Sequence, residues 1–204
     1  MLLLLSIGLS IVIALLTGGH LSGLARVPFK LGWLTFVALG LQVAAIYTVE
    51  PEWLPGVVLV SSYALLGVVV LANIRTPGVA LIALGLAANL AVIAANGGYM
   101  PVTPEAVSLI GMDHLISVTE AGNKVFGSKD IVLAYSDTNL WALSDIVVIR
   151  WPYPAIFSLG DLTLAAGAFW FIQASLHRSP PNASTSSRRG VTHEDSGQGD
   201  SVVS

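Results

Sequence analysis

The sequence has no cysteine, and charged residues make up only 10% of its 204 residues. Without cysteine the chain has no disulfide, no thiol nucleophile and no thiolate ligand for a metal. A soluble domain usually carries about 25% charged residues, so this shortage argues against a protein whose whole surface meets water. The formal net charge of −3, with scattered basic residues, gives no indication of nucleic-acid binding.

Hydrophobic residues make up 54% of the chain, and most of them fall into five long runs with few or no charges. An apolar run of about 20 residues spans the core of a bilayer as a helix. The sequence therefore predicts an all-α fold, a polytopic membrane helix bundle of about five spans within residues 1–178. The predicted spans are residues 2–17, 32–49, 56–74, 78–95 and 156–176.

The longest connection, residues 99–154, is expected to form a small ordered cap on one membrane face. Thr103-Pro104-Glu105 supplies an N-cap, a proline at the first helical position and an acid in the first turn, which predicts a short helix. Residues 131–133 and 146–149 are rich in branched side chains. The turn sequence at 137–139 lies between them, so a short β-hairpin is predicted.

The remaining polar segments suggest no cofactor. Residues 179–204 are rich in Ser, Pro, Gly, Asn and charge, which predicts a disordered tail. Asp113, His114 and Glu120 lack a further ligand at helical spacing, so we interpret them as surface residues and predict no metal. Lys129, with the other basic residues of the cap, is interpreted as part of a solvated face.

Basic residues of the short connections indicate the orientation of the bundle. Cytoplasmic loops carry an excess of Lys and Arg. The predicted topology is a multi-pass plasma-membrane protein with its N-terminus and cap outside and its tail in the cytoplasm. With five spans, these basic residues share one side of the membrane: Arg26, Lys30, Arg75 and Arg178.

A few polar side chains fall inside the predicted spans. Asp161 lies roughly 10 Å into the fifth helix if that helix begins at Pro154, at 1.5 Å per residue, and an ionisable group within a span is a functional hypothesis by default. Asn89 and Asn96 are two turns apart on one face of the fourth span, which ends at Gly97 and Gly98. Because lipid offers no hydrogen bonds, these groups are expected to line a polar, outward-facing vestibule or to bond one another between helices.

Asp145 precedes a Pro-Tyr-Pro corner at residues 152–154. An acid in a polar loop is usually solvated. The corner is expected to fold the preceding segment back over the mouth of the fifth helix, toward Asp161. Two carboxylates brought close do not easily both ionise, so Asp145 and Asp161 become candidate catalytic residues, a general acid and base around a water.

Several short motifs carry a resemblance to a known family. They are Gly18-Gly19, the run from Asn96 to Val102, Leu143-Ser144-Asp145-Ile146, and Phe157-Ser158-Leu159-Gly160-Asp161. With them, nearly everything up to Gln173 resembles an uncharacterised family of bacterial five-span membrane proteins, a domain of unknown function. The resemblance implies a bacterial plasma-membrane protein and brings no activity, because the family has none assigned.

A shorter stretch, residues 145–167, is similar in layout to the last part of signal peptidase II, the lipoprotein signal peptidase. That resemblance implies the roles of the two catalytic aspartates for Asp145 and Asp161. The motifs differ here, because Ser158 and Gly160 stand where that family has asparagine and alanine, and its Gly-Asn-x-x-Asp-Arg motif is missing.

Three function hypotheses follow. The first is a non-catalytic scaffold, partner-binding or lipid-interacting protein, whose partners are membrane lipids or another membrane protein. The second is an intramembrane aspartyl hydrolase that uses Asp145 and Asp161. Ion or proton conduction is favoured least, because only one acid is strongly placed within a span. Carboxyl groups within about 6 Å around a shared cavity would favour the hydrolase, whereas pairing of Asp161 with Asn96 or a backbone donor would favour the scaffold.

Overall fold

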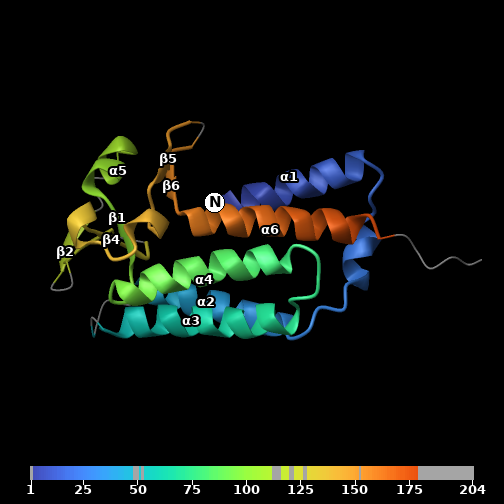
Figure 1. Ribbon diagram of the computed structural model, residues 1–204, viewed down its shortest axis with the longest axis horizontal. Coiled ribbons are helices and arrows are strands. Elements are labelled where there is room, and N and C mark those ends of the chain that lie inside the picture. Colours follow the sequence, from blue (N-terminus) through green and yellow to red (C-terminus); the bar gives the residue numbers. More distant parts are fainter. Residues whose placement is uncertain are drawn as a thin grey trace, which may run out of the picture.

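The computed structural model describes residues 2–47, 51, 53–111, 116–119, 122–125, 128–151 and 153–178. This part of the chain is mostly helical, and its long helices run side by side (Figure 1). We call the end of the bundle that carries residues 96–158 the strand end, and the opposite end the tail end. The long helices are α1 (Leu2–Leu16), α2 (Gly32–Tyr47), α3 (Trp53–Ala72), α4 (Val79–Ala95) and α6 (Leu159–Leu176).

Two of these helices meet a length and composition criterion for crossing a membrane. They are α3, with 20 residues, and α6, with 18 residues. Helices α1, α2 and α4 are apolar but have 15, 16 and 17 residues. The structure therefore confirms a predominantly helical chain with two candidate spans, and the five-span count stays a prediction.

The closest helix packing joins α4 and α6, which run antiparallel (Figure 1). A Cβ atom on Gly160 would lie 2.9 Å from the Gly85 carbonyl oxygen, and one on Gly167 would lie 2.9 Å from that of Gly78. Both pairs of glycines are spaced by seven residues, so they recur on one face of each helix. Small residues at such positions let two backbones approach closely. We call this contact the α4–α6 seam.

Serine side chains connect α1 to the other face of α6. Ser6 Oγ donates to the Ala165 carbonyl at 2.7 Å, and Ser10 Oγ donates to that of Phe169 at 2.9 Å. At the tail end, the 3-10 helix η1 (Leu21–Arg26) packs on α6. The hydroxyl groups of Ser6 and Ser10 thus form hydrogen bonds between α1 and α6.

The strand end is built from short elements. After α4 come β1 (Met100–Val102), α5 (Pro104–Leu109), β2 (Ile116–Thr119), β3 (Gly122–Val125) and β4 (Asp130–Val132). The sheet has the order β1-β4-β3-β2, with β1 and β4 parallel and the other pairs antiparallel. Two further strands, β5 (Val147–Ile149) and β6 (Ala155–Phe157), form an antiparallel hairpin. Between β4 and β5 lie the 3-10 helices η3 (Tyr135–Asp137) and η4 (Trp141–Leu143).

Several local predictions are confirmed and one pairing is wrong. Thr103 caps α5, because its Oγ1 accepts from the Ala106 amide at 3.1 Å. The predicted strands at 131–133 and 146–149 exist as β4 and β5, but they do not pair with each other. β4 pairs with β1 and β3, whereas β5 pairs with β6. Strand β6 overlaps the start of the predicted fifth span. Branched residues indicated the strands, but long-range pairing decided their partners.

Candidate functional site

Asp161 begins α6 as part of a capping box. The Asp161 amide donates to Ser158 Oγ at 2.9 Å, and the Ser158 amide donates to Asp161 Oδ2 at 3.3 Å. This reciprocal arrangement satisfies two amides that a helix start would otherwise leave unpaired. An acid in the first turn also interacts favourably with the helix dipole. Asp161 therefore has a structural role that its sequence position alone did not reveal.

Asn89, which is completely buried in α4, extends the capping box across the α4–α6 seam. Its Nδ2 donates to Asp161 Oδ1 at 2.7 Å, and its Oδ1 accepts from Ser158 Oγ at 2.9 Å. Asn89, Ser158 and Asp161 thus form a closed ring of hydrogen bonds. Tyr63 of α3 interacts with the Asn89 side chain and lies within electrostatic reach of Asp161.

Asp145 lies at the junction between the strands and the helices. Its amide donates to the Pro101 carbonyl at 3.1 Å, and it forms an isolated bridge with Val102 at the end of β1. Its side chain is buried, at 3% exposure, which contradicts the solvated loop acid expected for this residue type. Asp145 Oδ2 lies 3.6 Å from Lys129 Nζ, whereas Oδ1 has no hydrogen-bond partner among the described residues.

Lys129 connects two carboxylates. Its ammonium lies 3.4 Å from Asp130 Oδ1 as well as 3.6 Å from Asp145, so it is not part of a solvated face. Ser128 Oγ donates to the other oxygen of Asp130 at 2.6 Å. We call Lys129, Asp130 and Asp145 the junction cluster. One cation faces two acids, so the cluster carries a net negative charge when both acids are ionised.

The environment changes the proton affinity of two members of the cluster. Burial raises the pKa of Asp145 to about 7. The ammonium of Lys129 opposes this rise, and the carboxylates of Asp130 and Asp161 add to it. Burial lowers the pKa of Lys129, but Asp130 and Asp145 outweigh this effect and raise the pKa above its ordinary value. Near neutral pH, Asp145 can therefore gain or lose a proton while Lys129 stays charged.

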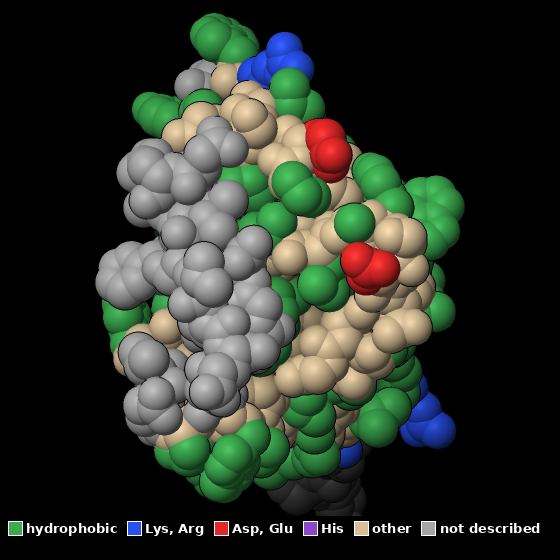
Figure 2. Space-filling view, turned by 90° about the vertical axis from the view of Figure 1, so that its left-hand side faces the viewer, with side chains coloured by type: hydrophobic (Ala, Val, Ile, Leu, Met, Phe, Trp, Pro, Cys, Tyr) green, Lys and Arg blue, Asp and Glu red, His purple; other side chains and the backbone are tan. Residues whose placement is uncertain are grey.

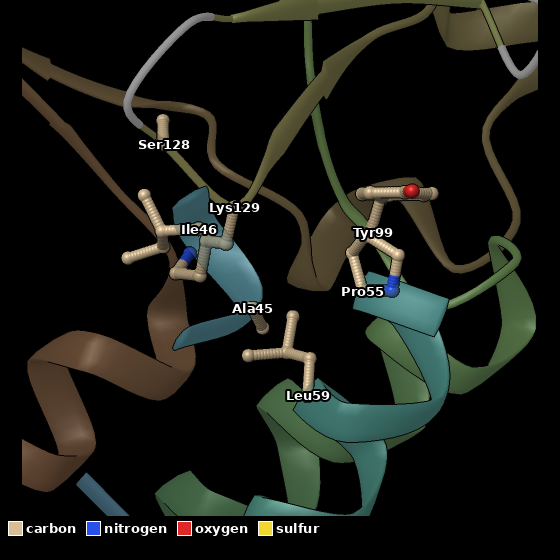
Figure 3. Close-up of a pocket in the computed structure, with 7 residues that line it drawn as sticks. All are labelled: Ala45, Ile46, Pro55, Leu59, Tyr99, Ser128 and Lys129. Atoms are coloured by element: carbon tan, nitrogen blue, oxygen red, sulfur yellow. The ribbon is translucent and has the colours of Figure 1, made fainter. Parts of the chain in front are cut away.

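A small cavity of about 10 Å³ adjoins Lys129 (Figure 3). This volume is at the lower limit for one water molecule, so the cavity has no room for a substrate. Figure 3 shows that its walls come from α2, α3, the chain after α4 and the chain before β4. The residues that line it are Ala45, Ile46, Pro55, Leu59, Tyr99, Ser128 and Lys129.

The two predicted catalytic aspartates lie at the same end of the bundle and interact electrostatically. Among the described residues, no hydrogen bond joins them. Asp161 is engaged by Asn89 and Ser158, and Asp145 faces Lys129. Their catalytic role stays a hypothesis.

The other predicted vestibule residues make separate contacts. Asn96 is the C-cap of α4, and it bonds reciprocally with Asn139: its Nδ2 donates to the Asn139 carbonyl at 2.9 Å, and its Oδ1 accepts from the Asn139 amide at 2.9 Å. Gly97 and Gly98 pack against Gly56 at the start of α3. Each of these contacts holds the strand end to the helices.

Sequence reasoning missed Lys129 and Tyr63 as members of this region. Lys129 stands directly before the segment predicted as a strand, next to Asp130. A lysine at the entrance of a buried strand is a weak signal, because only the pairing of β4 with β1 brings it to Asp145. Tyr63 carries no local signal, since tyrosine is common in apolar helices.

Comparison with known proteins gives one match. The model of a family described as a family of unknown function (DUF5317) matches residues 26–173. These residues include the helices from α2 to α5, most of α6, the junction cluster and the strands. No curated protein and no solved structure matches the chain significantly.

Proposed function

The chain belongs to this family of unknown function, which brings no activity with it, and from the geometry we propose a non-catalytic role as an integral membrane protein. In this proposal five helices cross the plasma membrane, the strand end faces outward and the tail lies in the cytoplasm. The strand end then binds a partner protein or lipid, and the bundle acts as its membrane scaffold.

The observation that carries the proposal is the distribution of side chains in the bundle. Large apolar side chains point outward all along the helices, with Phe36 77% exposed. Small polar side chains are buried between them, including Ser10, Ser62, Asn89 and Ser175. A water-soluble bundle instead carries polar and charged residues on its outer face. In lipid, buried polar groups that bond between helices stabilise the bundle.

The ends of the bundle support the proposed orientation. Basic residues lie in the tail-end connections: Arg26 closes η1, Arg75 lies between α3 and α4, and Arg178 follows α6. Lys129 at the strand end is neutralised by two acids. An excess of basic residues at one end supports a cytoplasmic location for that end.

The contacts of Asp161 favour the scaffold over the aspartyl hydrolase. A hydrolase that activates water needs an unengaged carboxylate that faces a cavity able to hold substrate. Both Asp161 oxygens accept hydrogen bonds, and the cavity near Lys129 accommodates at most about one water.

Single cysteines test the proposal in this cysteine-free chain. Ser136 at the strand end and Ser22 at the tail end are both exposed, so each is changed separately to cysteine. An impermeant thiol reagent should label Ser136→Cys in intact cells, and Ser22→Cys only after the cells are lysed. The protein should also stay with the membrane after alkaline extraction. The opposite labelling pattern would reverse the orientation, and release by alkali would refute membrane insertion.

A further inference from the structure

The β5–β6 hairpin has a partly buried base and an exposed tip. Val148 and Ile156 at the base pack on the apolar core of the strand end. The tip, which we define as Arg150, Trp151, Tyr153 and Pro154, is exposed throughout. Trp151 is 83% exposed and Tyr153 is 63% exposed. A rigid two-stranded base therefore presents two large aromatic side chains away from the protein.

The direction in which the hairpin projects indicates what kind of partner its tip contacts. In Figure 1 the hairpin projects sideways from the bundle, at the level where α6 begins and beyond the start of α1. In Figure 2, which looks onto the strand end, apolar and basic side chains stand at the upper margin, on the side to which the hairpin projects. The tip thus projects sideways, across the direction of the helix axes, instead of outward along these axes.

Other exposed aromatic side chains lie at the strand end of the bundle. Tyr47 is the last residue of α2 and Trp53 is the first residue of α3, and both are exposed. Trp and Tyr are enriched where a membrane helix meets the headgroup region, because their rings combine an apolar body with a polar group. Trp151 and Tyr153 add two exposed aromatic side chains to this end of the bundle, and Arg150 adds a cation suited to lipid phosphate.

We propose that the hairpin tip is an interfacial anchor that inserts Trp151 and Tyr153 into the headgroup region of the outer leaflet. This inference rests on the proposed membrane topology. It assigns the partner of the tip as a lipid surface, because the tip projects sideways from the bundle at the level where α6 begins. A protein partner docking on the strand end would meet side chains that point along the helix axes.

Tryptophan fluorescence tests the anchor. The chain has five tryptophans, so a variant with Trp33, Trp53, Trp141 and Trp170 all changed to Phe reports Trp151 alone. It is reconstituted into phosphatidylcholine vesicles that contain lipid brominated near the headgroup. We expect the bromolipid to quench Trp151 at least twofold, and aqueous iodide to quench it at least threefold less than free tryptophan in solution.

A second variant separates this inference from the proposed topology. With Trp170 of α6 as the only tryptophan, lipid brominated deep in the acyl chain should quench the emission, since Trp170 is exposed on a proposed span. If Trp170 is quenched by lipid and Trp151 only by iodide, the anchor is refuted and the topology stands. If neither is quenched by lipid, the topology itself is refuted. Should a four-fold variant not fold, the emission difference between wild type and Trp151→Phe measures the same contact.

Discussion

The α4–α6 seam and the junction cluster hold buried polar groups in opposite ways. In the seam, Asn89, Ser158 and Asp161 complete one another's hydrogen bonds, and glycines bring the two backbones together. In the junction, Asp145 has one oxygen 3.6 Å from Lys129 and another that finds no hydrogen-bond partner in the part of the chain that the structure describes. The polar groups of the seam have one arrangement in which they are hydrogen-bonded to one another. The arrangement of the junction depends on whether Asp145 carries a proton.

This difference assigns the two acids separate roles. A carboxylate whose bonds are all made stabilises a single packing arrangement. A buried carboxylate with an unpaired oxygen costs free energy when it is ionised. We therefore expect changes in the seam to affect the whole bundle, and changes in the junction to affect how the strand end is held and how that depends on pH.

The largest effect is expected from Gly160→Ala. The added Cβ would overlap Asn89 Oδ1 and lie 2.9 Å from the Gly85 carbonyl oxygen. Overpacking typically costs about 1–3 kcal/mol, and displacement of Asn89 leaves Asp161 and Ser158 short of partners. We expect a loss of about 4 kcal/mol or more, measured by thermal unfolding of the purified protein in detergent and by its abundance in membranes.

Gly67→Ala in α3 is the matched control, because a Cβ there has no atom within 4 Å. Alanine is the better helix former by about 1 kcal/mol, so this variant should be as stable as wild type or slightly more so. Similar losses of stability in both variants would show that the close approach in the seam is not what stabilises the bundle.

The next effect is the pH dependence of stability that Asp145 contributes. Its pKa in the folded protein, about 7, is above its ordinary value of 3.8, so the folded state binds more protons between these pH values. The free energy of unfolding should therefore fall as the pH rises from about 4 to 7, by about 3 kcal/mol. Unfolding in detergent is followed at pH 5 and pH 8.

Asp145→Asn removes this titration. The variant should be somewhat more stable than wild type at pH 5 and exceed it by more at pH 8, since an amide never takes the charge. Asp137→Asn, at an exposed site in η3, should leave the pH profile unchanged. An Asp145→Asn profile as steep as that of wild type would show that another group causes the pH dependence.

A smaller effect separates the structural role of Asp161 from a catalytic one. Asp161→Leu removes the acceptor of Asn89 and of the Ser158 amide. We expect it to cost about 2 kcal/mol, because buried unsatisfied donors cost about 1–3 kcal/mol. Asp161→Asn keeps an acceptor of similar size and should cost less than half as much.

The readout is membrane abundance together with unfolding in detergent, with growth of a deletion strain as a test of function. Wild-type growth with both Asp145→Asn and Asp161→Asn would exclude the paired-carboxylate hydrolase. Loss of growth with both, at unchanged stability, would instead contradict the non-catalytic proposal.

The sequence predicted the bundle better than it predicted the junction. Apolar runs and glycine turns are local signals, so all five predicted spans match helices to within about three residues at each described end. At the start of α6 the difference has a structural cause, because residues 156 and 157 are apolar enough for a span but pair with β5. Asn89 and Asp161 were recognised as polar residues within spans, but their contact needed the antiparallel packing of α4 and α6.

The junction depends on pairings between distant segments. Asp145 meets Lys129 because β1 pairs with β4 and bridges to Asp145. Nothing in the local pattern of either residue specifies that arrangement, since the same residues would suit a solvated loop. The grouping Asp113, His114 and Glu120 lies outside the described residues.

The smallest effect is expected where the strand end is attached by exposed hydrogen bonds. Asn139 bonds reciprocally with Asn96, and its own Nδ2 donates to the Ala95 carbonyl at 3.0 Å. Asn139→Ala removes only the side-chain bond to Ala95, because the two bonds with Asn96 use the Asn139 backbone. A net hydrogen bond is worth about 1 kcal/mol, and less where water competes, so global stability should fall by at most that amount. Hydrogen exchange should be faster in residues 134–144 and unchanged in α4 and α6.

Asn96→Ala should open the same loop further, because it removes both bonds between the Asn96 side chain and the Asn139 backbone. Exchange that rises equally throughout the bundle would show that strand end and seam unfold as one unit, and the distinction between them would then fail.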